Sequence, residues 1–161
     1  MTILMIGCDP GMTGYLALLD KDARLLDTAK MPLKPKDPKR KSNRVDPHGL
    51  GMIVQNWRKA YAGAPCYACI EDLQFMQGDK MGAFSLMNMG SAAGIAEGVL
   101  TIMCRGVMMV PPAKWKRDLR LSKDKAASVE LAHRLFNKNM GHDRAEAALI
   151  GYYGLSQGMG R

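Results

Sequence analysis

Apolar residues occur along this chain in short runs, separated by glycine, proline and charged residues. Runs of four to eight apolar residues bounded by turn residues predict buried strands. Five segments have this character, and they cover residues 2–9, 15–19, 24–31, 66–70 and 107–110. The first three follow one another with only tight turns between them, which predicts an antiparallel meander.

Apolar residues at intervals of three and four predict helices elsewhere. The first helix is expected to begin at Asp46 and Pro47, an acidic N-cap followed by proline at the first helical position. Ser122 is the expected N-cap of a later helix. The other helices are predicted over residues 83–104, 113–119, 123–137 and 142–155. Strands followed by alternating helices and strands predict an α/β fold, with helices on the faces of a mixed sheet.

The length of 161 residues suits a single domain, residues 1–161. Three prolines interrupt residues 32–45, which are therefore predicted to be an exposed basic loop, and residues 156–161 to be a flexible tail. Glu97 lies in the most apolar stretch, so no helix is expected to cross a membrane. Without a basic segment at residues 1–6 we expect no secretion signal and a reducing cytoplasm. The cysteines are expected to be buried free thiols, with Cys66 and Cys69 on opposite faces of a strand.

The predicted long helix contains three glycines, spaced every four residues on one face: Gly90, Gly94 and Gly98. Each glycine costs about 1 kcal/mol in a helix interior, so a close backbone contact is expected to offset it. That contact is either with the chain's own sheet or with a second helix. We expect the sheet, which would leave the opposite side of the helix for a partner: Met87, Ile95 and Met103.

Basic residues are concentrated in two segments of a chain whose net charge is +8. Residues 30–44 carry +6 and residues 114–125 carry +4, so the remainder is slightly acidic. Such clustering is typical of a surface that binds a polyanion, and two clusters favour nucleic acid over an ordinary solvated surface.

Four acidic residues lie where a strand ends or a helix begins. Asp9 and Glu71 end apolar runs, while Asp143 and Glu146 open the last helix on one face. Carboxylates that converge repel one another, so a cluster of them favours a divalent cation. Oxygen ligands alone favour Mg²⁺ or Mn²⁺ over Zn²⁺. Taken singly, Asp9 could form a turn, and the helix pair could stabilise the helix dipole.

These acids lie in segments that resemble the motifs of RuvC-like Holliday-junction resolvases. Residues 6–14 (IGCDPGMTG) resemble the first motif, residues 68–72 (ACIED) the second and residues 142–147 (HDRAEA) the third. Residues 110–116 (VPPAKWK) are similar to a segment of the phage and chloroplast branches. The four segments occur in the family's order along almost the whole chain.

The resemblance implies a ribonuclease H-like fold with strand order 3-2-1-4-5, and a homodimeric endonuclease that nicks two strands of a four-way DNA junction symmetrically. Asp9, Glu71, Asp143 and Glu146 would hold two Mg²⁺ ions, for which Mn²⁺ could substitute. Lys116 would lie beside the scissile phosphate, and the products would carry 5′-phosphate and 3′-hydroxyl ends. His142 is an alternative neighbour of the metal ions.

Branched DNA is the partner that the resemblance implies, without any membrane. Phe75 would stack at the junction, with Gln74 and Lys80 beside it. The phosphate contacts are expected from ten basic residues: Lys34, Lys36, Lys39, Arg40, Lys41, Arg44, Lys114, Arg117, Arg120 and Lys123. Two alternatives remain open. One is a related nuclease acting on RNA–DNA hybrids, ribosomal precursors or replication forks, and the other is a basic DNA-binding protein without catalysis.

Overall fold

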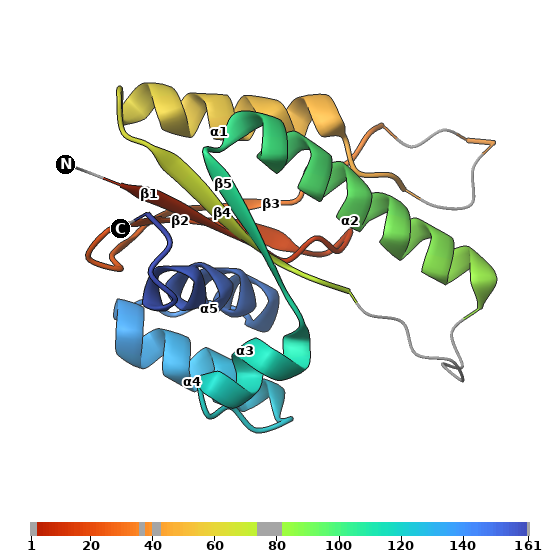
Figure 1. The fold of residues 1–161 in the computed structure, drawn as a ribbon. Helices are drawn as coiled ribbons and strands as arrows, with labels where there is room; N and C mark the ends of the chain where they lie inside the picture. Colours follow the sequence, from red (N-terminus) through yellow and green to blue (C-terminus); the bar gives the residue numbers. More distant parts are fainter. Residues whose placement is uncertain (1–2, 36–37, 40–42, 74–81, 161) are drawn as a thin grey trace.

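A five-stranded mixed sheet organises the chain (Figure 1). The computed structural model describes residues 3–35, 38–39, 43–73 and 82–160. The strands are β1 (Leu4–Cys8), β2 (Tyr15–Asp20), β3 (Leu25–Lys30), β4 (Cys66–Glu71) and β5 (Gly106–Val110). They lie in the order β3-β2-β1-β4-β5. All five predicted strands are present, and the order implied by the resemblance is confirmed.

The strand directions place three strand ends at one edge. β1, β2 and β3 form the predicted antiparallel meander. β4 runs parallel to β1, and β5 runs parallel to β4. The C-terminal ends of β1, β4 and β5 therefore lie at the same edge of the sheet, and the site described below is built there.

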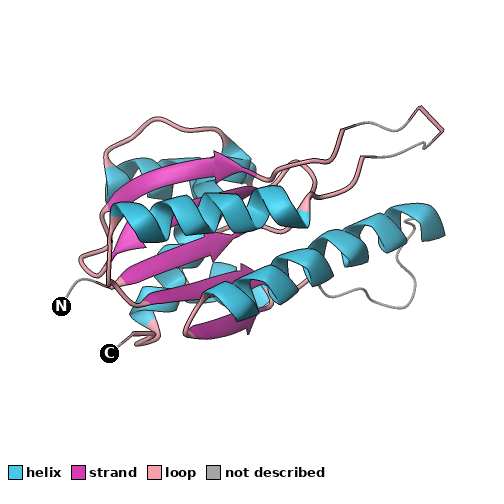
Figure 2. Ribbon diagram, turned by 90° about the horizontal axis from the view of Figure 1, so that it is seen from above, coloured by secondary structure: helices cyan, strands magenta, loops and turns pink. Residues whose placement is uncertain are grey.

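Helices cover both faces of the sheet (Figures 1 and 2). On one face lie α1 (Pro47–Ala60) and α2 (Ala83–Met103), and on the other α3 (Pro112–Asp118), α4 (Lys125–Phe136) and α5 (His142–Ser156). Side chains of a strand alternate between the two faces. In β1, Ile6 and Cys8 pack in the core under α1 and α2, while Met5 packs in the core under α5.

Two helix starts test the capping predictions. Asp46 is the N-cap of α1, where its side chain accepts a hydrogen bond from the His48 N–H and Pro47 takes the first helical position, as predicted. The predicted cap of α4 is wrong. Asp124 occupies that position and accepts from the Ala126 N–H at 2.9 Å. The Ser122 hydroxyl instead accepts a hydrogen bond from the Asp124 N–H, in the turn that precedes the helix.

The cysteines are free thiols, as predicted. Cys8, Cys66 and Cys69 are buried, whereas Cys104 is partly exposed, which the sequence did not predict. Cys66 and Cys69 lie in different cores on opposite faces of β4, in agreement with strand alternation.

The glycine face of α2 points away from the sheet, so the predicted packing of these glycines is wrong. Gly90, Gly94 and Gly98 are exposed, and a Cβ added at any of them would meet nothing within 4 Å. The sheet instead contacts the alanine side of the helix, where Ala92 and Ala96 are buried together with Leu100.

Met87, Ile95 and Met103 were predicted to form the side of α2 that meets a partner. This prediction is wrong for two of the three residues. Ile95 and Met103 pack against the core under α1 and α2. Met87 is exposed, as are the larger apolar side chains of Phe84 and Ile102. The free face of α2 is therefore the one that carries the glycines.

Among the described residues, α2 is the single helix whose length and composition would let it cross a membrane. The prediction that no segment is long and apolar enough to cross a membrane is therefore wrong for α2, even though this helix contains Glu97. A helix that packs on a protein core can pass the same test, and α2 packs on β4, β5 and α1.

Candidate active site

Two strand ends place Asp9 and Glu71 side by side. Cys8 and Ile70 are register partners in the parallel pair of β1 and β4, so the next residue on each strand is one of these acids. Met5 of β1 and Cys69 of β4 face α5, and alternation carries Asp9 and Glu71 to that same face. Glu71 is only 7% exposed. A carboxylate at such a position needs polar partners or a cation.

Helix α5 brings two more carboxylates to this edge because it lies unusually close to β1. A Cβ on Gly7 would lie 2.0 Å from the Ala147 carbonyl oxygen and 2.4 Å from the Gly151 nitrogen. Only glycine at position 7 permits this approach. The first turns of α5 carry Asp143 and Glu146, so the close contact fixes both at the ends of β1 and β4.

Helix α3 supplies two partners for the buried acids. It begins directly after β5, at the same edge of the sheet. Its fully buried Trp115 donates an indole N–H to Glu71 Oε1 at 3.0 Å. The Lys116 ammonium lies 2.7 Å from Glu146 Oε1 and 5.1 Å from the centre of the Trp115 ring. This small helix therefore holds both carboxylates by charge and hydrogen bonding.

Two further side chains contact Glu146. His142 Nε2 lies 3.3 Å from Glu146 Oε1, and His142 Nδ1 lies 3.2 Å from Asp143 Oδ1, so one imidazole bridges two carboxylates. Ser128 of α4 donates its hydroxyl to Glu146 Oε1 at 3.4 Å. No pattern in the sequence indicates Ser128 or the indole contact of Trp115, although Trp115 lies inside the motif-like segment 110–116.

The pKa values report a shared electrostatic environment. Burial raises the pKa of Asp9 to about 6; the Gly11 N–H opposes the shift, while Glu146 and Asp143 reinforce it. Burial also raises the pKa of Glu71 to about 7, against the Trp115 hydrogen bond and with help from Asp9 and Glu146. We refer to Asp9, Glu71, Asp143 and Glu146 as the acidic edge. Asp9 and Glu71 each feel negative charge on other members of it.

The donor chemistry of the acidic edge fits a hard divalent cation. It offers carboxylate oxygens, and the mutual repulsion that raises two pKa values is the kind of charge that Mg²⁺ relieves. Among the described residues, no three His, Cys, Asp or Glu side chains surround one common point. Lys116 and His142 instead contact Glu146, so the Lys116 ammonium already balances part of the negative charge at this edge.

The predicted DNA-contacting residues fall into three groups. Lys34, Lys39 and Arg44 are exposed on the basic loop, residues 32–45, whose base is closed by a bridge between Leu33 and Val45. This loop leaves the sheet on the same side as the C-terminal ends of β1 and β4 (Figures 1 and 2). Six predicted contacts lie outside the described residues: Lys36, Arg40, Lys41, Gln74, Phe75 and Lys80.

The third group lies on and after α3. Lys114 and Arg117 both pair with Asp118, at 3.1 and 3.0 Å. The Tyr153 hydroxyl also donates to Asp118, at 3.1 Å. Arg120 and Lys123 are exposed. Asp118 therefore neutralises part of the positive charge that the sequence predicts for this segment.

Comparison with known proteins finds solved structures with a similar fold. No protein-family model and no curated protein matches the sequence. The structure is similar to that of Thermus thermophilus RuvC in complex with a Holliday junction substrate, with a TM-score of 0.65 and 15% identity, over 98% of this chain and 97% of that chain. Another structure of T. thermophilus RuvC gives a TM-score of 0.58 and 16% identity, over 97% of both chains. The chain thus has the RuvC-like, ribonuclease H-like fold.

Proposed function

We propose, from the premise that the chain has the fold of RuvC, that it is a Mg²⁺-dependent endonuclease that resolves four-way DNA junctions. The observation that carries the proposal is the acidic edge. Four carboxylates from two strands and one helix lie at the C-terminal end of the central strands, and burial raises the pKa values of two of them, Asp9 and Glu71. Such an arrangement costs stability unless a cation binds, which is typical of a functional site.

The chain's own residues have distinct roles in this proposal. Asp9, Glu71, Asp143 and Glu146 would hold two Mg²⁺ ions, or Mn²⁺ in their place. When bound, these ions would activate a water and stabilise charge on the reacting phosphate. Trp115 fixes the orientation of Glu71, and Lys116 with His142 fixes that of Glu146. Lys116 also brings positive charge to the edge where a phosphate would lie. The products would carry 5′-phosphate and 3′-hydroxyl ends.

Positive charge on the same side of the molecule supports DNA as the substrate. Lys34, Lys39 and Arg44 extend from the basic loop, and Arg120 and Lys123 follow α3. Contacts with about eight phosphates would give a log–log salt slope near −7. In this proposal Phe75, with Gln74 and Lys80 beside it, stacks at the junction.

A second copy of the chain is needed for paired nicks, and we place it on the free face of α2. That face is uncharged apart from Glu97, and it is lined by three exposed glycines with open space above them. Exposed Met87 and Ile102 lie on the same helix, at 62% and 85%. A long apolar helix face with no side chains at its centre suits close approach of an identical helix.

Cleavage of a panel of substrates tests the proposal. A four-way junction, a replication fork, an RNA–DNA hybrid and a linear duplex are incubated with the protein, with and without Mg²⁺. We expect paired nicks in opposite strands of the junction, only with Mg²⁺, and their loss in Asp9→Asn. Lys21→Gln, at an exposed basic residue in the turn between β2 and β3 and outside both basic segments, is the control for protein quality.

The other results separate the alternatives. Preferential cutting of the hybrid or the fork would assign a related nuclease with another substrate. Tight junction binding without any Mg²⁺-dependent cleavage would assign a DNA-binding protein. Wild-type cutting by folded Asp9→Asn would remove the acidic edge from the mechanism altogether.

A further inference from the structure

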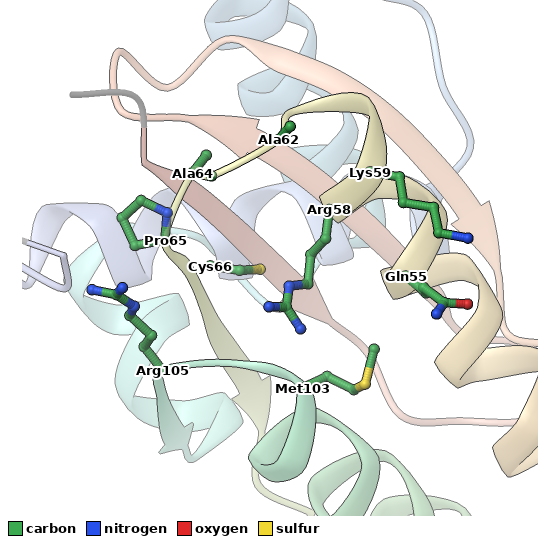
Figure 3. Close-up of a pocket in the computed structure, with 10 residues that line it drawn as sticks. Gln55, Arg58, Lys59, Ala62, Ala64, Pro65, Cys66, Met103 and Arg105 are labelled. Atoms are coloured by element: carbon green, nitrogen blue, oxygen red, sulfur yellow. The ribbon is translucent and has the colours of Figure 1, made fainter.

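A second feature lies at the opposite edge of the sheet, where β4 and β5 begin. A cavity of about 660 Å³ opens there between the end of α1 and the end of α2. Arg58, Lys59 and Arg105 line it, and no acidic residue does. Cys66 forms part of its wall, and Figure 3 shows the Cys66 sulfur directed towards Arg58. The cavity therefore gives access to one thiol in a positively charged setting.

A second thiol lies against the first. Cys104 Sγ is 3.7 Å from Cys66 Sγ and donates its S–H to it. The backbone holds both residues in place, because the Arg105 N–H donates to the Cys66 carbonyl at 2.8 Å and the Cys104 N–H donates to Leu100. Cys104 is the C-cap of α2, and a disulfide would shorten the Sγ–Sγ separation from 3.7 Å to about 2.05 Å. We refer to Cys66 and Cys104 as the thiol pair.

The two thiols are chemically unequal. The hydrogen bond from Cys104 lowers the pKa of Cys66, burial opposes this, and the Arg58 charge lowers it further. The same contact raises the pKa of Cys104, and burial adds to the rise. A thiolate is the nucleophilic form of cysteine, so Cys66 is the thiol that reacts first and Cys104 is the one that follows.

We propose that the thiol pair is an oxidisable site, at which hydrogen peroxide entering the cavity converts Cys66 and Cys104 into a reversible intramolecular disulfide. The Cys66 thiolate attacks one peroxide oxygen, an S–O bond forms, the O–O bond breaks, and the hydroxide released takes up a proton. The Cys104 thiol then attacks the sulfenic acid sulfur, an S–S bond forms and water leaves with the Cys104 proton. The pair loses two electrons and one peroxide becomes two waters.

The chain contains its own comparison for this reactivity. Cys8 and Cys69 are buried, as Cys66 is, but burial raises the pKa of Cys8 well above its ordinary value and that of Cys69 to about 12. Neither lines the cavity. Oxidation should therefore be confined to the thiol pair while the other two cysteines stay reduced.

The disulfide would link the start of β4 to the end of α2 and close a loop of 38 residues. A crosslink of this length reduces the entropy of the unfolded chain, so the oxidised protein should melt several degrees higher than the reduced protein. The inference does not rest on the proposed function, because the thiol pair lies at the edge of the sheet opposite the acidic edge.

Treatment of the full chain with a small excess of hydrogen peroxide tests the proposal. The intact mass should fall by two hydrogen atoms, a non-reducing peptide map should contain a Cys66–Cys104 crosslink, and dithiothreitol should restore both the mass and the original Tm. Cys104→Ser should instead accumulate a sulfenic acid at Cys66 that dimedone traps. Arg58→Gln should slow the reaction by roughly tenfold, and Cys8→Ser, the matched control, should behave as wild type.

Three results would overturn the proposal. They are addition of oxygen atoms without loss of hydrogen, a crosslink between two chains, and oxidation of Cys8 or Cys69 at the same rate as Cys66. Because Cys104→Ser reports on Cys66 alone, the test requires no substitution at Cys66. The nuclease assays are separate, so loss of either proposal leaves the other intact.

Discussion

Two helices of this molecule, α5 and α2, both carry glycines at helical spacing, but in opposite surroundings. On α5, a Cβ at Gly151 would lie 2.6 Å from the Leu19 side chain and 3.1 Å from the Gly7 nitrogen. On α2, a Cβ at Gly94 would meet nothing within 4 Å. The same residue type thus allows contact with the sheet in one helix and leaves an open face on the other.

The different surroundings of these glycines correspond to different roles of the two helices. α5 is buried almost throughout its middle, from Ala145 to Gly151, and its position on β1 is fixed by backbone contact. Its first turns therefore present Asp143 and Glu146 to Asp9 at a defined place. α2 buries Ala92, Ala96 and Leu100 and keeps the side that carries its three glycines exposed. A helix that is fixed can build a catalytic site, whereas a helix with an open face can bind a partner.

Loss of one carboxylate on each helix gives the largest expected contrast. Glu146→Gln on α5 should lower the rate of junction cleavage about a thousandfold, roughly 4 kcal/mol in activation free energy, because it removes a proposed metal ligand. Glu97→Gln on α2 is the matched control and should change the rate less than twofold. Single-turnover cleavage with Mg²⁺ measures both. Similar rates for the two variants would place the chemistry away from α5.

Added methyl groups sharpen the contrast in stability. Gly7→Ala forces backbone atoms of β1 and α5 apart and should lower the free energy of unfolding by about 3 kcal/mol. Gly94→Ala in α2 should instead raise it by up to about 1 kcal/mol, because alanine favours a helix and the new methyl meets nothing. Urea titration measures both values. Equal changes in the two variants would contradict the close approach of α5.

The sequence predicted most of the fold because the relevant signals are local. Asp46 and Pro47 begin a helix through contacts within one turn, and apolar runs bounded by turns define all five strands. The outward face of α2 could not be predicted in this way. Apolar side chains occur on every side of that helix, including Phe84, Ile95 and Ile102, so no polar stripe marks the solvent side.

From the residue pattern alone, the candidate site was predictable only in its acids, whereas Lys116 and His142 came from the family resemblance. Asp9 and Glu71 follow buried strands, and the parallel register of Cys8 with Ile70 then places them together. The contact of Trp115 with Glu71 joins residues 44 positions apart, and no periodicity reports such a contact. The same holds for Ser128 and Glu146, which meet only because α4 packs on α5.

Proton binding gives a third way to distinguish the two sides of the sheet, because Asp9 and Glu71 face α5. Their folded pKa values, about 6 and about 7, lie above the ordinary values of 3.8 and 4.5. Between about pH 4 and 7 the folded protein keeps protons that the unfolded chain releases. Without divalent cations, the free energy of unfolding should therefore fall by up to several kcal/mol as the pH rises through this window, and level off above it.

Three comparisons check the origin of this pH dependence. Glu71→Gln should flatten the fall, whereas Glu97→Gln on α2 should leave it as in wild type. Mg²⁺ should raise the Tm more at pH 8, where the acidic edge is ionised, than at pH 5, and removal of Mg²⁺ by EDTA should reverse the gain. A Tm that rises with pH in the absence of Mg²⁺ would show that burial does not raise these two pKa values.

The smallest expected effect concerns the open face of α2. Gly94→Arg places a bulky charge at the centre of the proposed dimer contact and should weaken dimerisation at least tenfold, about 1.4 kcal/mol. Ala60→Arg, at an exposed position of α1, adds the same side chain elsewhere and should leave the dimer unchanged. Sedimentation velocity over a range of micromolar concentrations measures both variants. If wild type itself sediments as a 17.7 kDa species throughout that range, the open face serves some other contact, and symmetric cleavage would require the DNA to bring two copies together.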